Sequence, residues 1–140
     1  SIAVLNPYCQ FTIVGKLELT KVFPKNIKFI NRVNQNELVS IYNSNKYYLQ
    51  LSMSEGFPNA LCEAMLCGCI PIGSNVAGIP DIIGEKGYIL KEKNTIILNN
   101  IISNLSNNTF SPNEVRTQIS NNYPLERREN EFLTHVNKII

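Results

Sequence analysis

Residues 47–73, YYLQLSMSEGFPNALCEAMLCGCIPIG, contain the pattern that decides the fold. The apolar run over residues 47–52 predicts a strand, and residues 58–67 have the composition of a helix. Proline suits the first helical position, and Gly68 suits the position just after a helix. A second short apolar run follows over residues 69–73. The stretch therefore predicts a strand, a loop, a helix and a second strand.

The same alternation of apolar runs and helical patterns continues on both sides of this stretch. We expect further strands over residues 9–14, 27–30 and 87–90, and a helix after Asn34, which forms a capping box with Glu37. Strands that alternate with helices imply right-handed crossovers and a parallel sheet covered on both faces. The sequence therefore predicts an α/β fold with a doubly wound parallel sheet.

The last third of the chain has a helical pattern only. Its first helix carries an apolar stripe at helical spacing, formed by Ile97, Ile101 and Leu105. A second helix begins after Ser111, and a third is expected over residues 125–139. We therefore expect residues 1–140 to form a single domain with a helical tail over about 94–140.

The composition narrows the range of functions. The chain has 140 residues, 44% of them hydrophobic, and a net charge of +2, which is typical of one globular domain with a hydrophobic core. The basic residues are scattered, so no nucleic-acid-binding face is predicted, and no apolar run has transmembrane length. The chain opens in mid-pattern without an initiator methionine, which we interpret as an excerpt from a longer protein.

The residues that could ligate a metal lack the spacing of a metal site. Cys62, Cys67 and Cys69 match no zinc pattern, and the single histidine, His135, is far from them in the sequence. We expect no metal and no cofactor. We also expect the cysteines to be free thiols in a cytoplasmic protein, because reducing compartments keep thiols reduced.

Two carboxylates flank the start of the predicted helix. Free N–H groups around Asn59, Ala60 and Leu61 would form an anion site, to which the helix dipole adds about 0.3–1 kcal/mol for a phosphate. Glu55 and Glu63 beside that site suit a ligand that also carries hydroxyl groups, since carboxylates accept hydrogen bonds from a diol. That combination describes a nucleotide-diphosphate sugar. Alternatively, Glu55 only favours the helix dipole and Glu63 is a solvated helix position.

These residues resemble the motifs of a known family. Residues 54–65, SEGFPNALCEAM, are similar to the E-x7-E signature of the retaining glycosyltransferases of family 4, also called glycosyl transferases group 1. Residues 67–72, 76–83 and 87–90 resemble the segments that follow this signature in the family. The resemblance extends from about residue 11 to residue 90.

The resemblance implies a fold and a set of roles. Family members have two Rossmann-like domains that face each other in a GT-B fold, and this chain resembles the C-terminal, donor-binding domain. Glu63 would bind the ribose hydroxyls and Glu55 the hydroxyls of the transferred sugar. Two segments would bind the rest of the donor: the backbone of Gly56, Phe57, Pro58, Asn59, Ala60 and Leu61 at the sugar and diphosphate, and the loop of Asn31, Arg32 and Val33 at the base.

Several parts of the family pattern are missing from residues 1–10. The family's Arg and Lys that steady the leaving diphosphate have no match there, and the first strand of the domain and the acceptor-binding domain are also missing. We therefore expect one sheet edge or apolar face to be uncovered, and we expect the isolated chain to transfer no sugar. If the protein contacts a membrane surface, we expect the missing domain to make that contact.

Three functions stay open at this point. The first is the donor-binding half of an enzyme that moves a hexosyl group from a nucleotide-diphosphate sugar to a glycan or lipid with retention of configuration, without a metal. The second is a non-catalytic nucleotide-binding or assembly domain with the same fold. The third is another GT-B enzyme, such as a sugar-nucleotide epimerase, which the E-x7-E motif disfavours.

Overall fold

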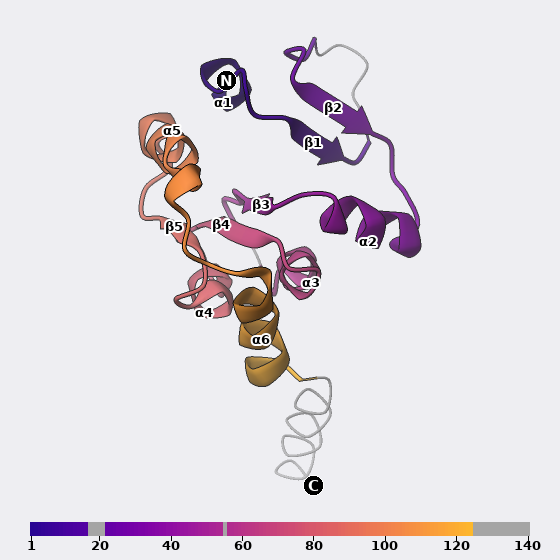
Figure 1. Cartoon of the computed structure of the whole chain (residues 1–140), viewed down its shortest axis with the longest axis vertical. Coiled ribbons are helices and arrows are strands. Elements are labelled where there is room, and N and C mark those ends of the chain that lie inside the picture. Colours follow the sequence, from indigo (N-terminus) through magenta and orange to yellow (C-terminus); the bar gives the residue numbers. More distant parts are fainter. Residues whose placement is uncertain (17–21, 55, 125–140) are drawn as a thin grey trace, which may run out of the picture.

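The computed structural model describes residues 1–16, 22–54 and 56–124 (Figure 1). Glu55 and the helix predicted over residues 125–139 lie outside this part of the chain. The elements follow one another in this order: α1 (Ile2–Leu5), β1 (Phe11–Val14), β2 (Ile27–Ile30), α2 (Gln35–Asn43), β3 (Tyr47–Gln50), α3 (Asn59–Leu66), β4 (Ile70–Ser74), α4 (Ile79–Ile83), β5 (Tyr88–Leu90), α5 (Thr95–Ser103), the 3-10 turn η1 (Leu105–Asn107) and α6 (Pro112–Asn122).

The described strands form two parallel sheets. β1 pairs with β2, and β3, β4 and β5 pair in that order, so every pairing is parallel, as expected for strands joined by helices. The prediction of an α/β fold with parallel strands is confirmed. Among the described residues each sheet has two edge strands, β1 and β2 in the smaller sheet and β3 and β5 in the larger one.

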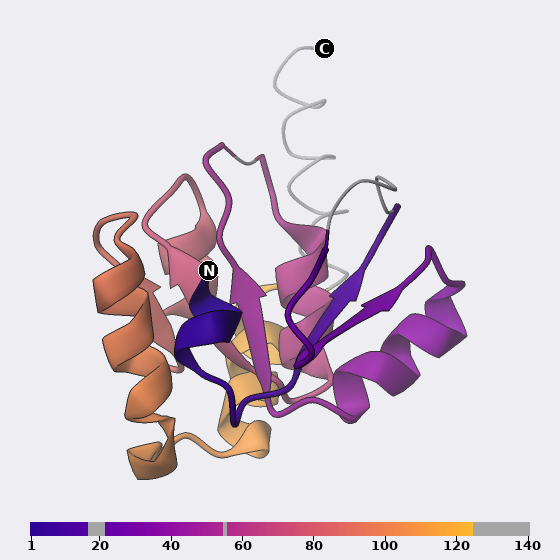
Figure 2. The same cartoon turned by 90° about the horizontal axis from the view of Figure 1, so that it is seen from above.

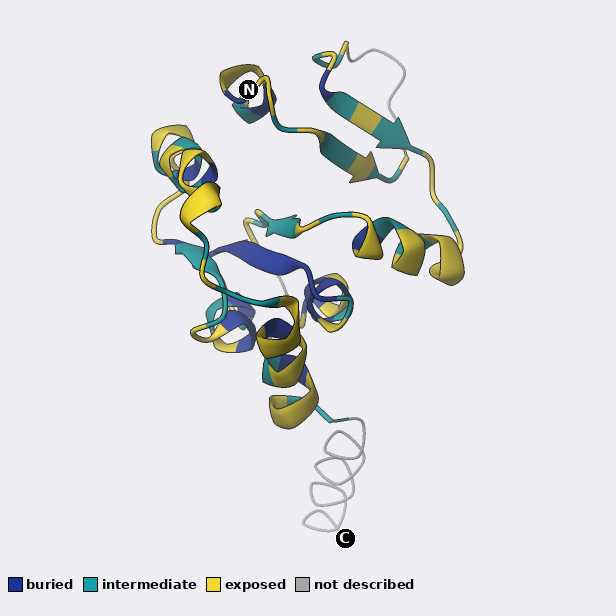
Figure 3. Ribbon diagram, viewed as in Figure 1, coloured by how far each residue is buried: buried dark blue, intermediate teal, exposed yellow. Residues whose placement is uncertain are grey.

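The core surrounds β4, whose five residues are all buried (Figure 3). One apolar cluster packs β4 against α3, α4 and α6, with Leu61, Ile79 and Val115 among its members. A second cluster joins Ile72 of β4 to Leu98 and Ile102 of α5. Both faces of the larger sheet are therefore covered by helices, which explains why β4 has a nearly continuous apolar sequence.

The N-terminal strand pair is attached to the rest of the molecule through α1 and α5. The amide nitrogen of Asn26 donates to the carbonyl oxygens of Ala3, Asn6 and Cys9 at 2.9–3.0 Å, which fixes α1 beside the start of β2. The amide of Asn6 then donates to Asn99 Oδ1 on α5 at 2.9 Å. These polar contacts connect segments that are far apart in the sequence, and no sequence periodicity indicated them.

Two local predictions were wrong. Pro58 is not the first helical residue but the residue before the helix, because its ψ of 83° lies outside the helical range. The predicted stripe of α5 is also wrong in its most buried members, which are Leu98 and Ile102, although Ile101 and Leu105 of the predicted stripe pack against the same cluster. In a helix with apolar residues on several faces, spacing alone does not say which face meets the sheet.

Two capping boxes fix the starts of α2 and α6. At α2, the Asn34 side chain accepts the N–H of Glu37, and the Glu37 carboxylate accepts the N–H of Asn34. At α6, Ser111 and Glu114 make the same reciprocal pair. Both helix starts agree with their prediction from the sequence.

Glu114 makes stability depend on pH. Its carboxylate accepts hydrogen bonds from the Ser111 backbone and hydroxyl and lies 3.0 Å from the Lys86 ammonium, and these contacts lower the pKa of Glu114 from 4.5 to about 2. Because the folded pKa lies below the unfolded one, the stabilisation is complete above about pH 4.5 and is lost as the pH falls toward 2. We expect the free energy of unfolding of Glu114→Gln, measured by urea unfolding at a series of pH values, to fall less at acid pH than that of wild type. Glu92→Gln, at an exposed glutamate, is the control. If the two variants show the same dependence of unfolding free energy on pH, the assignment to Glu114 is contradicted.

Candidate functional site

The candidate site lies at the carboxyl ends of the strands, where the loops after β3 and β4 project on the same side of the sheet (Figure 2). In parallel α/β sheets this is where ligands bind. The loop after β3 leads into α3, which carries Glu63, and the loop after β2 contains residues 31–33. The structure thus places both predicted binding segments after the carboxyl end of a strand.

Glu63 is half-buried in the second turn of α3. Within the described chain its carboxylate accepts no hydrogen bond and forms no ion pair. Its titratable neighbours Cys62 and Tyr42 stay neutral near pH 7. Burial, and after it the charge of Glu63, raises the pKa of the Cys62 thiol to about 11. Burial first, and the Tyr48 and Glu63 charges after it, also raise the pKa of Tyr42 on α2. Glu63 therefore presents a carboxylate whose hydrogen-bonding capacity is available to a ligand.

The N-terminus of α3 offers fewer free donors than the sequence suggested. The N–H of Asn59 donates to the carbonyl oxygen of Phe57 at 3.0 Å. The N–H of Leu61 donates to the carbonyl oxygen of Pro58, also at 3.0 Å. The expectation of three free N–H groups is therefore wrong for Asn59 and Leu61. Among the three, Ala60 is the residue whose N–H has no acceptor in the described part of the chain. An anion at this helix start would have to meet Ala60 or displace the local hydrogen bonds.

The other predicted site residues differ in exposure. Gly56 and Phe57 are exposed at the start of α3, whereas Pro58 is buried. Asn31 and Arg32 are exposed in the loop after β2, and Val33 is half-buried there. The exposed members are accessible to a ligand, while Pro58 and the fully buried Leu61 could contact one only through their backbone.

Three residues near the site were not found by sequence reasoning. The buried Ser74 hydroxyl at the end of β4 donates to the carbonyl of Ser52 at 2.9 Å and so holds the loop after β3. Tyr123, after α6, lies with its ring 5.7 Å from that of Phe57. Ala77, in the loop after β4, has a φ of 47°, a left-handed conformation that non-glycine residues rarely adopt and that is enriched at functional sites. Only the position of Ser74 at the end of an apolar run could have signalled its role.

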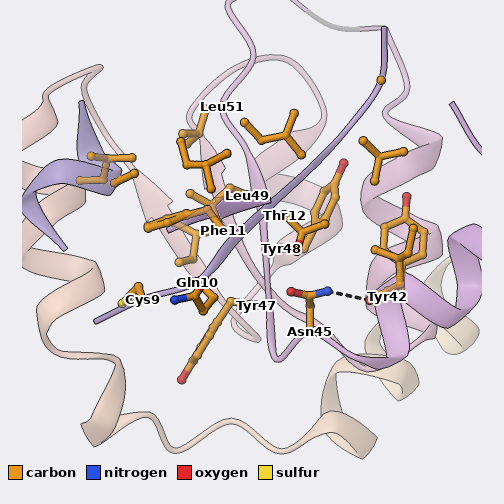
Figure 4. Close-up of a pocket in the computed structure, with 18 of the residues that line it drawn as sticks. Cys9, Gln10, Phe11, Thr12, Tyr42, Asn45, Tyr47, Tyr48, Leu49 and Leu51 are labelled. Atoms are coloured by element: carbon orange, nitrogen blue, oxygen red, sulfur yellow. Dashed lines mark hydrogen bonds between the residues drawn. The ribbon is translucent and has the colours of Figure 1, made fainter. Parts of the chain in front are cut away.

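A cavity of about 1480 Å³ lies between β1 and β3 (Figure 4). Its lining includes Arg32, Val33 and Ala60 of the predicted site but not Glu63. This cavity is therefore distinct from the position of the Glu63 carboxylate.

The described residues carry neither a metal site nor a membrane span. No group of three or more His, Cys, Asp or Glu side chains that could hold a metal ion comes together there. The four cysteines are free thiols. None of the described helices has both the length and the apolar composition needed to cross a bilayer.

Comparison with known sequences gives one family and several relatives. The family described as glycosyl transferases group 1 matches residues 3–124. The serotype-specific mannosyltransferase WbdA of Escherichia coli is 36% identical over 56 residues, which are 40% of this chain and 7% of that protein. N-acetyl-alpha-D-glucosaminyl L-malate synthase of Bacillus anthracis is 35% identical over 77 residues, 51% of this chain and 20% of that protein. The chain thus spans a fifth or less of these two relatives.

Solved structures share the fold. The C-terminal domain of a glycosyl transferase group 1 family protein (LpcC) from Francisella tularensis superimposes with a TM-score of 0.63 and 24% identity, over 72% of this chain and 55% of that one. The GtfA/B complex superimposes with a TM-score of 0.74 and 22% identity, over 98% of this chain and 31% of that one.

Proposed function

Because the chain belongs to the glycosyl transferases group 1 family, we propose that it is the donor-binding half of a hexosyltransferase that uses a nucleotide-diphosphate sugar. The acceptor is a glycan or lipid, and the transferred sugar keeps its configuration. Relatives named as mannosyltransferases and the one named as an N-acetyl-glucosaminyl malate synthase support a hexosyl donor. A cytoplasmic location belongs to the same proposal and agrees with the four free thiols.

One observation carries the proposal: the half-buried carboxylate of Glu63 has no hydrogen-bond or ion-pair partner among the described residues, at the carboxyl end of a parallel sheet. A carboxylate in this state suits the two hydroxyl groups of a ribose, since each charged hydrogen bond contributes about 1.5–3 kcal/mol. A partly buried carboxylate with a structural role normally contacts a cation or a helix N-terminus, and Glu63 contacts neither within the described part of the chain.

The remaining donor groups are assigned around Glu63. Glu55, outside the described residues, binds hydroxyls of the transferred sugar. The backbone from Gly56 to Leu61 meets the sugar and the diphosphate, with Ala60 N–H as the donor that needs no rearrangement. The loop of residues 31–33 contacts the base.

In this mechanism the protein positions the donor and stabilises charge. The leaving diphosphate takes the proton of the acceptor hydroxyl as its bond to the anomeric carbon breaks, so no side chain of this chain has to act as a general base. Glu55 and Glu63 orient the sugar and the ribose, and fixed donors aimed at the diphosphate stabilise the charge that develops there. The acceptor-binding half supplies the second substrate.

Titration of the 140-residue chain with UDP-, GDP- and ADP-sugars tests the proposal. We expect one nucleotide class to bind, with the free nucleoside diphosphate retaining most of the affinity, and we expect no transfer to any acceptor. Absence of binding for all three classes would contradict the donor-binding role. Transfer by this chain alone would instead contradict its assignment as half of an enzyme.

A further inference from the structure

A chain of hydrogen bonds runs along one face of β3 to the loop that follows it. The hydroxyl of Tyr48 donates to Gln50 Oε1 at 2.9 Å, and Gln50 Nε2 donates to the hydroxyl oxygen of Ser52 at 2.8 Å. Side chains two positions apart lie on the same face of a strand, so the three groups follow one another toward the carboxyl end of β3. Gln50 therefore links a residue inside the strand to a residue in the loop.

The inner end of this chain is fixed by the core. The ring of Tyr48 lies 5.8 Å from the ring of the buried Tyr42 on α2, in an edge-to-face arrangement. The Tyr48 ring also packs with the cluster that contains Ala64 of α3 and Cys69, the residue just before β4. Close packing allows few side-chain positions. The chain of hydrogen bonds thus begins at a hydroxyl whose position is set by three surrounding elements.

The outer end is fixed from β4. The buried hydroxyl of Ser74 donates to the carbonyl oxygen of Ser52 at 2.9 Å, and the carbonyl oxygen of Gln50 lies 3.4 Å from the same hydroxyl. Ser52 is therefore held twice, by its backbone through Ser74 and by its side chain through Gln50. In the sequence, Ser52 stands at the start of the loop and three residues before Glu55.

A glutamine at the end of β3 is not what packing alone favours. Strands of a parallel sheet that is covered on both faces are normally apolar. Gln50 is half-buried, so its ordering costs side-chain entropy and its amide group loses contact with water. The two hydrogen bonds offset these costs only while Tyr48 and Ser52 keep their positions. Gln50 therefore stabilises one position of the loop and not only the strand.

We propose that Gln50 is a positioning residue of the donor site, which acts through Ser52 to hold the loop after β3 in the form that binds the transferred sugar and the diphosphate. This inference rests on the proposed donor-binding function, in which this loop and the start of α3 meet these two groups. Gln50 itself does not touch the donor. A loop that is held in advance loses less conformational entropy when a ligand binds, so the ligand is bound more tightly.

The position of the chain also says which part of the donor depends on it. Glu63 and residues 31–33 are assigned to the ribose and the base, and neither belongs to the hydrogen bonds that pass through Gln50. The transferred sugar is assigned to the loop itself. A loosened loop should therefore weaken binding of the intact donor more than binding of the free nucleoside diphosphate.

Three variants of the 140-residue chain test the inference. Gln50→Met keeps the approximate length of the side chain but removes both hydrogen bonds, and Tyr48→Phe removes only the hydroxyl that donates to Gln50. Tyr47→Phe is the matched control on the opposite face of β3. Its hydroxyl donates to the carbonyl oxygen of Leu105 in η1, at the same distance of 2.9 Å, and takes no part in the chain that reaches the loop.

Calorimetry with UDP-, GDP- and ADP-sugars and with the corresponding free diphosphates measures the affinities. For the nucleotide class that binds wild type, we expect Gln50→Met and Tyr48→Phe to weaken the intact donor by about two- to tenfold, the scale of one lost hydrogen bond. The free diphosphate should lose less affinity, and Tyr47→Phe should change neither. Amide order parameters at residues 52–54, measured by NMR without ligand, should fall in the first two variants and stay unchanged in the control.

Gln50→Glu is the rescue variant. Its carboxyl group accepts from the Tyr48 hydroxyl and shares a hydrogen bond with the Ser52 hydroxyl in either ionisation state, so the order parameters should return to those of wild type. A Gln50→Met variant that weakens donor and free diphosphate equally, or that leaves the order parameters unchanged, would overturn the inference, as would equal effects of Tyr48→Phe and Tyr47→Phe. Absence of binding to wild type would instead overturn the donor-binding function, and the order parameters alone would then decide whether Gln50 holds the loop.

Discussion

Replacing Glu63 with alanine should weaken binding of the free nucleoside diphosphate and of the intact donor by about the same factor. The ribose is common to both ligands, and Glu63 is assigned to its hydroxyl groups. Loss of a charged hydrogen bond costs about 1.5–3 kcal/mol, which corresponds to about one to two decades in affinity. Calorimetry on the 140-residue chain with both ligands measures the two losses of affinity side by side.

Two variants separate this role from a general effect of charge. Glu63→Gln keeps the shape and one acceptor but removes the charge. Its affinity for both ligands should therefore lie between the affinities of wild type and Glu63→Ala. Glu55→Ala should leave the free nucleoside diphosphate bound as well or slightly better, because a negative charge near the phosphates is removed, and should weaken only the intact donor. The opposite pattern, with Glu55→Ala abolishing diphosphate binding and Glu63→Ala leaving it intact, would reverse the two assignments.

Leu61→Ala is expected to give the largest loss of stability among substitutions on α3. Leu61 is fully buried in the cluster that packs α3 against α4, α6 and β4. Truncating a buried leucine removes its transfer free energy and leaves a cavity, at a cost of about 2–5 kcal/mol. The total free energy of unfolding of a small domain is about 5–15 kcal/mol. The urea concentration at the unfolding midpoint should therefore fall strongly.

Leu66 provides a matched control on the same helix. It is the same residue type, but 47% of its surface is exposed at the end of α3. Its backbone carbonyl accepts a hydrogen bond from Arg116, which the substitution leaves in place. Leu66→Ala should therefore change stability by roughly 0.5 kcal/mol or less. Equal midpoints for the two variants would show that α3 does not pack as described.

Much of the fold could be predicted from local patterns. The apolar runs located all five described strands, because a buried parallel strand such as β4 needs apolar residues on both faces. The capping box of α2 and the start of α6 after Ser111 were also predicted correctly, since both depend on residues only a few positions apart. These features are fixed by neighbours in the sequence.

Features that depend on distant segments could not be predicted in this way. The buried face of α5 depends on which side Leu98 turns toward the larger sheet, and the cavity between β1 and β3 depends on how these two strands are placed. Asn26, which links α1 to the start of β2, gives no periodic signal at all.

The candidate site was predicted in its location more than in its detail. The motif around Glu63 correctly indicated a helix that follows a strand at the carboxyl end of the sheet. The local hydrogen bonds of Asn59 and Leu61 were not foreseen, because Pro58 precedes the helix instead of opening it. The hydroxyl of Ser74 and the ring of Tyr123 reach the site region from later elements, and no motif contained them.

Amide chemical-shift mapping of the 140-residue chain during titration with nucleotide-diphosphate sugars tests the central claim most directly. Binding of the donor at the β3–α3 turn and the loop after β2 predicts that the largest changes fall on residues 31–33 and on the amides from Gly56 through Glu63, with little change on the exposed face of α6. Changes concentrated away from these two segments, or the absence of changes with UDP-, GDP- and ADP-sugars alike, would contradict the claim that this chain binds the donor.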